Sequence, residues 1–352
     1  MLSTNRRYDI DWIRVIAIGL LVIYHTSIGF QPWGRMIGFI TTDKPWMSLW
    51  TPMAMLNVWR IPLLFFVSGM GVYFAIQNRN WKQLLVERAS RILVPFVFGI
   101  FCIVPLHVYI LQYYYEMQPT YVANPGHLWF LGNIFVYVLI FTPLFFYLKK
   151  NEDGKLVSWL RKLMSTLLGL LPVVGAFVIE VLILDPRPYE MYVMTKHGFF
   201  LGLLAFFFGF CFVLCGEGFS KMIVKWRWLF LAGGIALFAI RNYESSVGAP
   251  VLNWQLPIET NCWILSVLAF GYQYLNRPGK ALAYLSQAAY PVYILHMIFL
   301  YLGSLLIFRL TIPVQLQFVL VVLFTLVGCF GTYEVIRRVS LLRFLFGLKR
   351  QG

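Results

Sequence analysis

The sequence predicts an all-α, polytopic membrane protein of about ten transmembrane helices. Of its 352 residues, 60% are apolar or aromatic and only 12% are charged. Its mean hydropathy is +0.73, more than a soluble domain of this size needs for its core. Apolar stretches of about 20 residues, the length that crosses ~30 Å of hydrocarbon, recur along the chain. We therefore expect a single integral membrane domain over residues 1–352, without a separate soluble domain.

Ten windows fit this length and composition. The third contains Pro95 and Pro105, which leave helix carbonyls without their usual donor and predict an irregular helix. The seventh and eighth are short or flanked by polar residues. The predicted spans are residues 12–30, 53–76, 92–111, 128–148, 164–184, 197–216, 226–241, 257–275, 288–308 and 313–336.

Lysine and arginine are distributed unevenly between the loops on the two sides. With the N-terminus in the cytoplasm, 22 of the 29 lie on the cytoplasmic side and 6 on the other, with Arg60 inside the second span. This positive-inside bias places both termini in the cytoplasm of a multi-pass protein of the cell membrane. The net charge of +15 follows from it and from anionic membrane lipid, so we expect no nucleic-acid partner. The first apolar stretch is not expected to be a cleaved signal, because Asp9, Asp11 and Arg14 lie at its start.

Nothing in the sequence predicts a metal site, a disulfide framework or a bound cofactor. The five cysteines lie in or beside spans and are interpreted as small apolar residues. The histidines are dispersed, without a His-x₃-His pair, and phosphate-binding or dinucleotide-binding glycine motifs are lacking.

Arg14 and His25 are the most informative pair. Eleven residues of helix correspond to roughly 1100° and about 16 Å, so the two side chains point the same way at different depths. Ionisable groups inside a membrane are costly and mark functional paths. We expect His25 to take the proton of a hydroxyl group, Arg14 to position an anion and Asp11 to orient Arg14. The alternatives are an interfacial anchor for Arg14 and a structural hydrogen bond for His25.

Other polar residues lie inside or beside the predicted spans, where contact with lipid would be unfavourable. Arg60 before Pro62, followed by Ser68 and Gly69, favours an irregular second span that lines a cavity, or simple packing of small residues. Arg88 and Arg91, three residues apart, suit a phosphate group or serve as membrane anchors. His127 and Trp129 open the fourth span at the outer face, where an aromatic belt also explains the tryptophan. Glu259 and His296 either line a path or form structural hydrogen bonds. Glu334 with Arg337 or Arg338 predicts an ordinary interfacial ion pair.

Together these motifs resemble the acyltransferase-3 family of integral membrane O-acyltransferases. The motifs are Arg-x₁₀-His in the first span, FFVSG in the second, RxxR before ILVPF, HLWFL and YPVYILH, and they keep their order from about Tyr8 to Lys349. HLWFL, the IET stretch at 258–260 and the ending TYEVIRRVSLLRFLFG are most similar to the osmoregulated periplasmic glucan succinyltransferase (glucan biosynthesis protein C) branch.

The resemblance implies transfer of a small acyl group, acetyl or succinyl, from cytoplasmic acyl-coenzyme A to a hydroxyl of an extracytoplasmic carbohydrate. His25 is then the base or the carrier of an acyl-histidine intermediate. Implied partners are acyl-coenzyme A, a glycan acceptor and membrane lipid, and no cofactor. The implied donor-side residues are Arg14, Arg60, Ser68, Arg88 and Arg91, and the acceptor-side residues are His127, Trp129, Glu259 and His296.

A transporter or exporter of a small solute or an envelope precursor is the alternative. Such a protein also has many spans, intramembrane charges and proline breaks. It usually carries two corresponding halves with broken helices. No such repeat is found in the sequence, which favours the enzyme.

Overall fold

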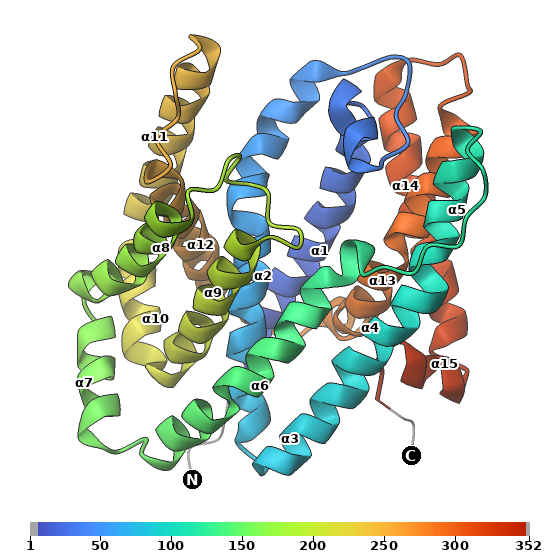
Figure 1. The fold of residues 1–352 in the computed structure, drawn as a ribbon. Helices are drawn as coiled ribbons and strands as arrows, with labels where there is room; N and C mark the ends of the chain where they lie inside the picture. Colours follow the sequence, from blue (N-terminus) through green and yellow to red (C-terminus); the bar gives the residue numbers. More distant parts are fainter. Residues whose placement is uncertain (1–5, 350–352) are drawn as a thin grey trace. The chain divides into compact units, whose positions relative to one another are not determined.

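The computed structural model describes residues 6–349, whose regular structure is helical with no strand (Figure 1). The all-α prediction is confirmed; residues 1–5 and 350–352 of the predicted domain lie outside the described part. Each predicted span coincides with a helix. The helices that match single spans are α1 (Tyr8–Ile28), α2 (Trp50–Ile76), α6 (Trp129–Lys150), α8 (Leu171–Leu184), α9 (Lys196–Leu214), α11 (Arg227–Ser246), α12 (Gln255–Tyr274), α13 (Lys280–Ile307) and α14 (Val314–Ile336).

The third span is irregular, as its prolines predict. It runs through α3 (Trp81–Arg88), η3 (Ala89–Leu93), α4 (Val94–Phe98), η4 (Gly99–Ile103) and α5 (Val104–Tyr114). Both η3 and η4 are π-helical, and each is followed within two residues by a proline. The wider turn accommodates the carbonyls that proline leaves without a donor, so the helix stays continuous.

The second span is regular, and the expected break at Ser68 and Gly69 is absent. Helix α2 is continuous from Trp50 to Ile76 with Pro62 inside it. A Cβ atom on Gly69 would lie 1.9 Å from the carbonyl oxygen of Phe206, and one on Gly209 would lie 2.1 Å from that of Phe66. The backbones of α2 and α9 therefore approach each other through two glycines, which is the small-residue packing alternative.

Eight helical segments among the described residues are each long and apolar enough to cross a membrane, and a bent pair gives a ninth. The bent pair is α10 (Gly216–Lys225) with α11, at an angle of 58°. Helix α12 does not belong to this set, because its first half carries Glu259, Thr260 and Asn261. The prediction of ten spans with both termini in the cytoplasm thus depends on α12 and stays a prediction.

The described chain forms two compact units. Unit 1 contains residues 6–14, 57–85 and 136–279, and unit 2 contains residues 15–56, 86–135 and 280–349. In unit 1, α12 packs against α8, α10 and α11, while α7 (Lys155–Met164) packs against α9 and α10. Phe145 and Phe210 stack in its core with ring centroids 3.7 Å apart. This burial of aromatic surface stabilises the contact between α6 and α9.

Unit 2 is built around α13, which packs against α5, η4 and α14. The short helix α15 (Ser340–Leu345) contacts α4 and α14. The segment after α1 folds back onto it, because the amides of Thr42 and Trp46 donate to the carbonyls of Gly29 and Phe30 at 2.9 Å. Two short helices, η1 (Pro32–Ile37) and η2 (Met47–Leu49), lie in this segment, and η5 (Gly126–Leu128) precedes α6.

Candidate functional site

The start of helix α1 carries the expected ion pair. Nη1 of Arg14 lies 3.3 Å from Oδ1 of Asp11, and Nη2 of Arg6 lies 3.0 Å from the other oxygen of the same carboxylate. The side chain of Arg14 is 37% exposed, and that of Asp11 is 18% exposed. A carboxylate that is hydrogen-bonded on one side fixes the direction of a long, flexible guanidinium. This geometry is consistent with the orienting role predicted for Asp11.

His25 lies further along the same unbroken helix, within unit 2, and it contacts His296 of α13. Nδ1 of His25 is 2.8 Å from Nε2 of His296. The two rings are nearly parallel, with centroids 5.1 Å apart and planes 12° from each other. Two histidines that are 271 residues apart in the sequence therefore form one hydrogen-bonded pair.

The backbone carbonyl of Tyr293 decides how protons are arranged in this pair. Nδ1 of His296 donates to that oxygen at 2.7 Å, so it must carry a proton. In neutral His296 the other ring nitrogen, Nε2, is then an acceptor, and Nδ1 of His25 donates to it. Neutral His25 consequently has its lone pair on Nε2. An imidazole whose far nitrogen donates to a fixed partner is the arrangement of a general base.

Two further histidines extend the pair into a cluster. His127, in η5, lies 5.0 Å from His296 between ring centroids, and His107, in α5, lies 5.4 Å from His127. Nε2 of His127 donates to the carbonyl of Ile294 at 3.0 Å. Nδ1 of His127 and Nδ1 of His107 are buried and have no hydrogen-bond partner among residues 6–349. Such nitrogens are suited to hydrogen-bond a polar ligand. We call His25, His107, His127 and His296 the histidine cluster.

The histidines are dispersed in the sequence but not in the structure. Four of the five converge in unit 2, although α1, α5, η5 and α13 contribute one each. Sequence spacing cannot detect such a cluster, because no two of its members lie on one short segment. His107 was missed, although its place between Pro105 and an aromatic run was a usable signal. Among the described residues, no three histidine, cysteine or acidic side chains are placed to hold a metal ion.

Trp129 follows His127 closely in the sequence but is not part of the histidine cluster. Trp129 begins α6, two residues after His127, and is 7% exposed. Its indole ring contacts Phe130, with centroids 6.5 Å apart. Its acceptor-side role stays a prediction.

The remaining donor-side candidates lie in different surroundings. Arg60, in α2, is fully buried, and Ser68 donates its hydroxyl to the carbonyl of Leu64 at 2.7 Å. Arg91 lies in π-helical η3, 3.4 Å from the carboxylate of Glu87, whereas Arg88 ends α3. The π-helical turn rotates Arg91 away from the position that an α-helix would give it relative to Arg88. Both arginines are partly exposed.

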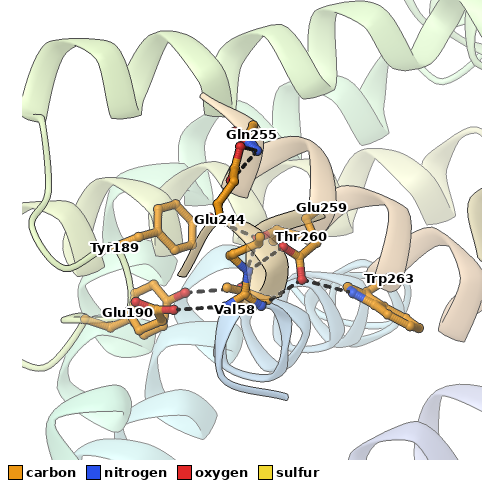
Figure 2. A network of polar contacts seen from close by, with 10 residues as sticks. Val58, Tyr189, Glu190, Glu244, Gln255, Glu259, Thr260 and Trp263 are labelled. Atoms are coloured by element: carbon orange, nitrogen blue, oxygen red, sulfur yellow. Dashed lines mark hydrogen bonds and ion pairs between the residues drawn. The ribbon is translucent and has the colours of Figure 1, made fainter. Parts of the chain in front are cut away.

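Glu259 is the centre of a buried network in unit 1 (Figure 2). Nε and Nη2 of Arg241 donate to its two carboxylate oxygens at 2.8 and 2.9 Å. The indole nitrogen of Trp263 lies 3.4 Å from one of them, and Glu190 lies 3.7 Å from Arg241. A bidentate pair of this kind joins α11 to α12. The geometry supports a structural role for Glu259, and its acceptor-side role remains a prediction.

The network continues through hydroxyl groups (Figure 2). Thr260 donates to the carbonyl of Val58 and lies 3.0 Å from the hydroxyl of Tyr189. The hydroxyl of Tyr192 donates to the same carbonyl at 3.1 Å. Burial raises the pKa of Tyr189 far above its usual value, so its hydroxyl keeps its proton. These bonds connect the loop before α9 to α2 and α12.

A buried histidine–glutamate pair in unit 1 was also missed. Nδ1 of His197 lies 2.9 and 3.1 Å from the two oxygens of Glu180, and both side chains are about 5% exposed. The rings of Tyr189 and Tyr192 pack on the imidazole. Seventeen residues separate the pair in sequence, and a cis-proline loop lies between their helices, so helical spacing gave no signal.

Fold and site together define a multi-pass, all-α membrane protein in which four histidines form one cluster. The acyltransferase-3 family model, described as an acyltransferase domain, matches residues 7–334. The chain therefore belongs to the acyltransferase-3 family and is a membrane acyltransferase. In the comparisons with curated proteins and with solved structures, nothing matches the chain.

Proposed function

We propose that the protein transfers a small acyl group, acetyl or succinyl, from cytoplasmic acyl-coenzyme A to a hydroxyl of an extracytoplasmic carbohydrate. The observation that carries this proposal is the hydrogen bond between His25 and His296, which leaves Nε2 of His25 able to accept a proton. A general base of this kind is what a hydroxyl acceptor needs in order to attack a thioester.

The step balances with His25 alone as the proton carrier. Nε2 of His25 takes the proton of the acceptor hydroxyl while its oxygen attacks the thioester carbonyl carbon. The carbon–sulfur bond breaks, and the imidazolium returns the proton to the thiolate of coenzyme A. During the step, Nδ1 of His25 keeps donating to His296, whose own proton is held by the carbonyl of Tyr293. This second contact stabilises the positive charge on His25.

Helix α1 supports a donor that enters from the cytoplasm. Arg14 lies near the start of α1, which the positive-inside bias predicts to be cytoplasmic, and His25 lies about 16 Å further along. This distance matches the length of an extended pantetheine arm in order of magnitude. Arg14, Arg88 and Arg91 are proposed to hold the donor phosphates, with Arg60 and Ser68 along the arm. His127, Trp129 and Glu259 are proposed for the acceptor side, together with His296, which acts there through its hydrogen bond to His25. His107 joins them, because its ring lies 5.4 Å from that of His127 between centroids and its Nδ1 is buried.

The carbohydrate and the branch of the family are proposed from the motifs. HLWFL, the IET stretch and the basic C-terminal segment favour a periplasmic glucan as acceptor and succinyl as the acyl group. A protein of this kind belongs in the inner membrane, where cytoplasmic donor and external acceptor meet at opposite faces. Mass spectrometry of envelope glycans with and without the gene tests this, because the enzyme leaves an ester on its acceptor.

Substitution at His25 tests the mechanism. We expect His25→Ala and His25→Gln to lower kcat by roughly 100-fold or more, because neither side chain accepts a proton near neutral pH. The glutamine amide retains a donor toward His296, so His25→Gln controls for loss of packing. Thermal unfolding of both purified variants should stay near that of the wild type. Near-normal acyl transfer by either variant would falsify the mechanism, and trapping of an acyl group on His25 would replace direct transfer by an acyl-enzyme.

A further inference from the structure

A pocket lined by arginine lies at the end of unit 2 that carries the C-terminal segment. Its walls are Gln287 of α13, Arg337 and Arg338 after α14, and Arg343 of α15, and its volume is about 430 Å³. We call it the arginine pocket. Its lining is polar, which excludes an acyl chain or another apolar group as its occupant.

The pocket holds more positive charge than its neighbours neutralise. Glu334 lies 2.9 Å from Arg337 and 3.7 Å from Arg338, and among the described residues no other carboxylate is paired with the arginines of the pocket. Glu334 also accepts a hydrogen bond from the hydroxyl of Tyr284 at 2.8 Å. Three guanidinium groups against one carboxylate leave an excess of two positive charges. Such an excess in a concave site attracts anions.

Arg343 is held in place without losing its charge. Its Nη1 donates to the carbonyl of Arg337 at 2.8 Å, and its Nε donates to the carbonyl of Lys349 at 3.0 Å. Both acceptors are uncharged backbone oxygens. A guanidinium fixed in this way has already lost much of its side-chain freedom, so binding an anion costs less entropy.

The segment that carries Arg343 is packed against the RxxR motif. A Cβ atom on Gly347, which has a φ of 67°, would lie 2.5 Å from the carbonyl oxygen of Arg91. The ring of Phe346 contacts Phe98 of α4, with centroids 5.6 Å apart. The arginine pocket and Arg91 therefore belong to one basic end of unit 2. Membrane anchoring explains the number of arginines there, but it does not explain why three of them line a hollow.

We propose that the arginine pocket binds a phosphate ester at the cytoplasmic face. Planar guanidinium groups bind phosphate oxygens through paired hydrogen bonds, and the side chain of Gln287 lies on the same wall. Two sources supply this chemistry there: the nucleotide phosphates of the acyl donor and the head group of an anionic phospholipid. The donor assignment rests on the proposed function, whereas the phosphate chemistry rests on the pocket itself.

The test measures binding to the purified full-length chain in lipid nanodiscs. The variant is Arg338→Gln with Arg343→Gln, and the control is Lys221→Gln with Lys225→Gln, which removes the same charge from α10. In phosphatidylcholine nanodiscs, the variant should bind coenzyme A at least about tenfold more weakly than the control. Comparison with 3′-dephospho-coenzyme A identifies which phosphate the pocket holds. The wild-type affinity should also fall with added salt.

A second arm replaces part of the phosphatidylcholine by phosphatidylglycerol. If a lipid head group occupies the pocket, this lipid should raise the thermal unfolding midpoint of the wild type and of the control but not of the variant. If the double variant does not fold, Arg338→Gln alone replaces it in both arms. The side chain of Arg338 is 74% exposed, so its substitution should leave the fold intact. A variant that equals the control in both arms overturns the proposal. A wild type that binds no coenzyme A but shows the lipid effect overturns the proposed donor and keeps the pocket.

Discussion

At the scale of single residues, the proposed base and its partner come from opposite ends of the sequence. Neutral His25 could adopt either of two tautomers, and only the tautomer with a proton on Nδ1 presents a basic Nε2. His296 selects that form because its own acceptor nitrogen faces Nδ1 of His25 at 2.8 Å. In the proposed mechanism His296 acts through His25, as a positioning residue, and the carbonyl of Tyr293 fixes its ring in turn.

We expect His296→Ala to lower kcat by roughly 10- to 100-fold with little change in KM, because the substrate contacts remain while the base loses its orientation. His296→Gln should recover part of the loss, since its amide oxygen accepts the Nδ1 proton of His25. Steady-state kinetics against pH measures both effects. A purely structural His296 predicts the opposite pattern, in which the two variants lose activity and thermal stability in parallel.

What the sequence revealed about these residues is their chemistry rather than their arrangement. Arg14, Asp11 and His25 were recognised because helix geometry relates positions on one segment. The ion pair between Arg14 and Asp11 is present. His296 and His127 were singled out separately, but their contact with His25 depends on the packing of three distant segments. His107 offered only a weak signal, its place between Pro105 and an aromatic run, and His197 offered none, because a lone histidine in an apolar stretch is indistinguishable from a structural one.

At the scale of elements, the pair of Arg241 and Glu259 joins α11 to α12. Glu259 is 1% exposed, so neutralising it leaves a buried guanidinium facing an amide. We expect Glu259→Gln to destabilise the protein by about 3 kcal/mol. Arg241→Met combined with Glu259→Leu should recover most of this, because the one carboxylate that loses its partner, Glu190, is 23% exposed and stays hydrated. Thermal or denaturant unfolding in detergent measures the difference.

The control for this prediction is Glu217→Gln. Glu217 pairs with Lys221 at 2.9 Å on the surface, and 77% of its side chain is exposed. The Glu217→Gln variant should therefore be nearly as stable as the wild type. If Glu259→Gln has the same unfolding free energy as Glu217→Gln, the structural role of Glu259 is contradicted. If the Glu259→Gln variant is stable but loses affinity for the glycan, Glu259 belongs to the acceptor side as the sequence predicted.

Element positions were largely predictable, and element regularity was not. Every apolar window coincides with a helix, because the hydrocarbon thickness sets a length that composition reveals directly. The prolines of the third span produced π-helical turns, whereas Pro62 lies inside a continuous α2. The two cases differ in their neighbours. The carbonyl of Val58, which Pro62 leaves without its helical donor, accepts the hydroxyls of Tyr192 and Thr260 instead, and such distant partners are not encoded in local sequence.

At the scale of the whole molecule, the direction of transfer depends on the number of membrane crossings. A cytoplasmic donor and an external acceptor require Arg14 and Arg88 to face the cytoplasm, and the 22 to 6 distribution of basic residues supports this. Eight helices, or nine with the bent pair, are apolar enough to cross. The predicted tenth is α12, whose polar residues bond inside unit 1: Glu259 with Arg241, and Thr260 with Val58.

Because these polar groups are satisfied within the protein, the cost of placing α12 in a membrane is small, and we expect it to cross. Reporter fusions decide this. A periplasm-active phosphatase should work when joined after Ser246, before α12, and fail when joined after Gly279, while a fluorescent protein that folds only in the cytoplasm should behave in the opposite way. Equal behaviour of the two fusion sites would mean that α12 does not cross. The chain would then have an odd number of spans, and the C-terminal arginine pocket would face away from the cytoplasmic donor.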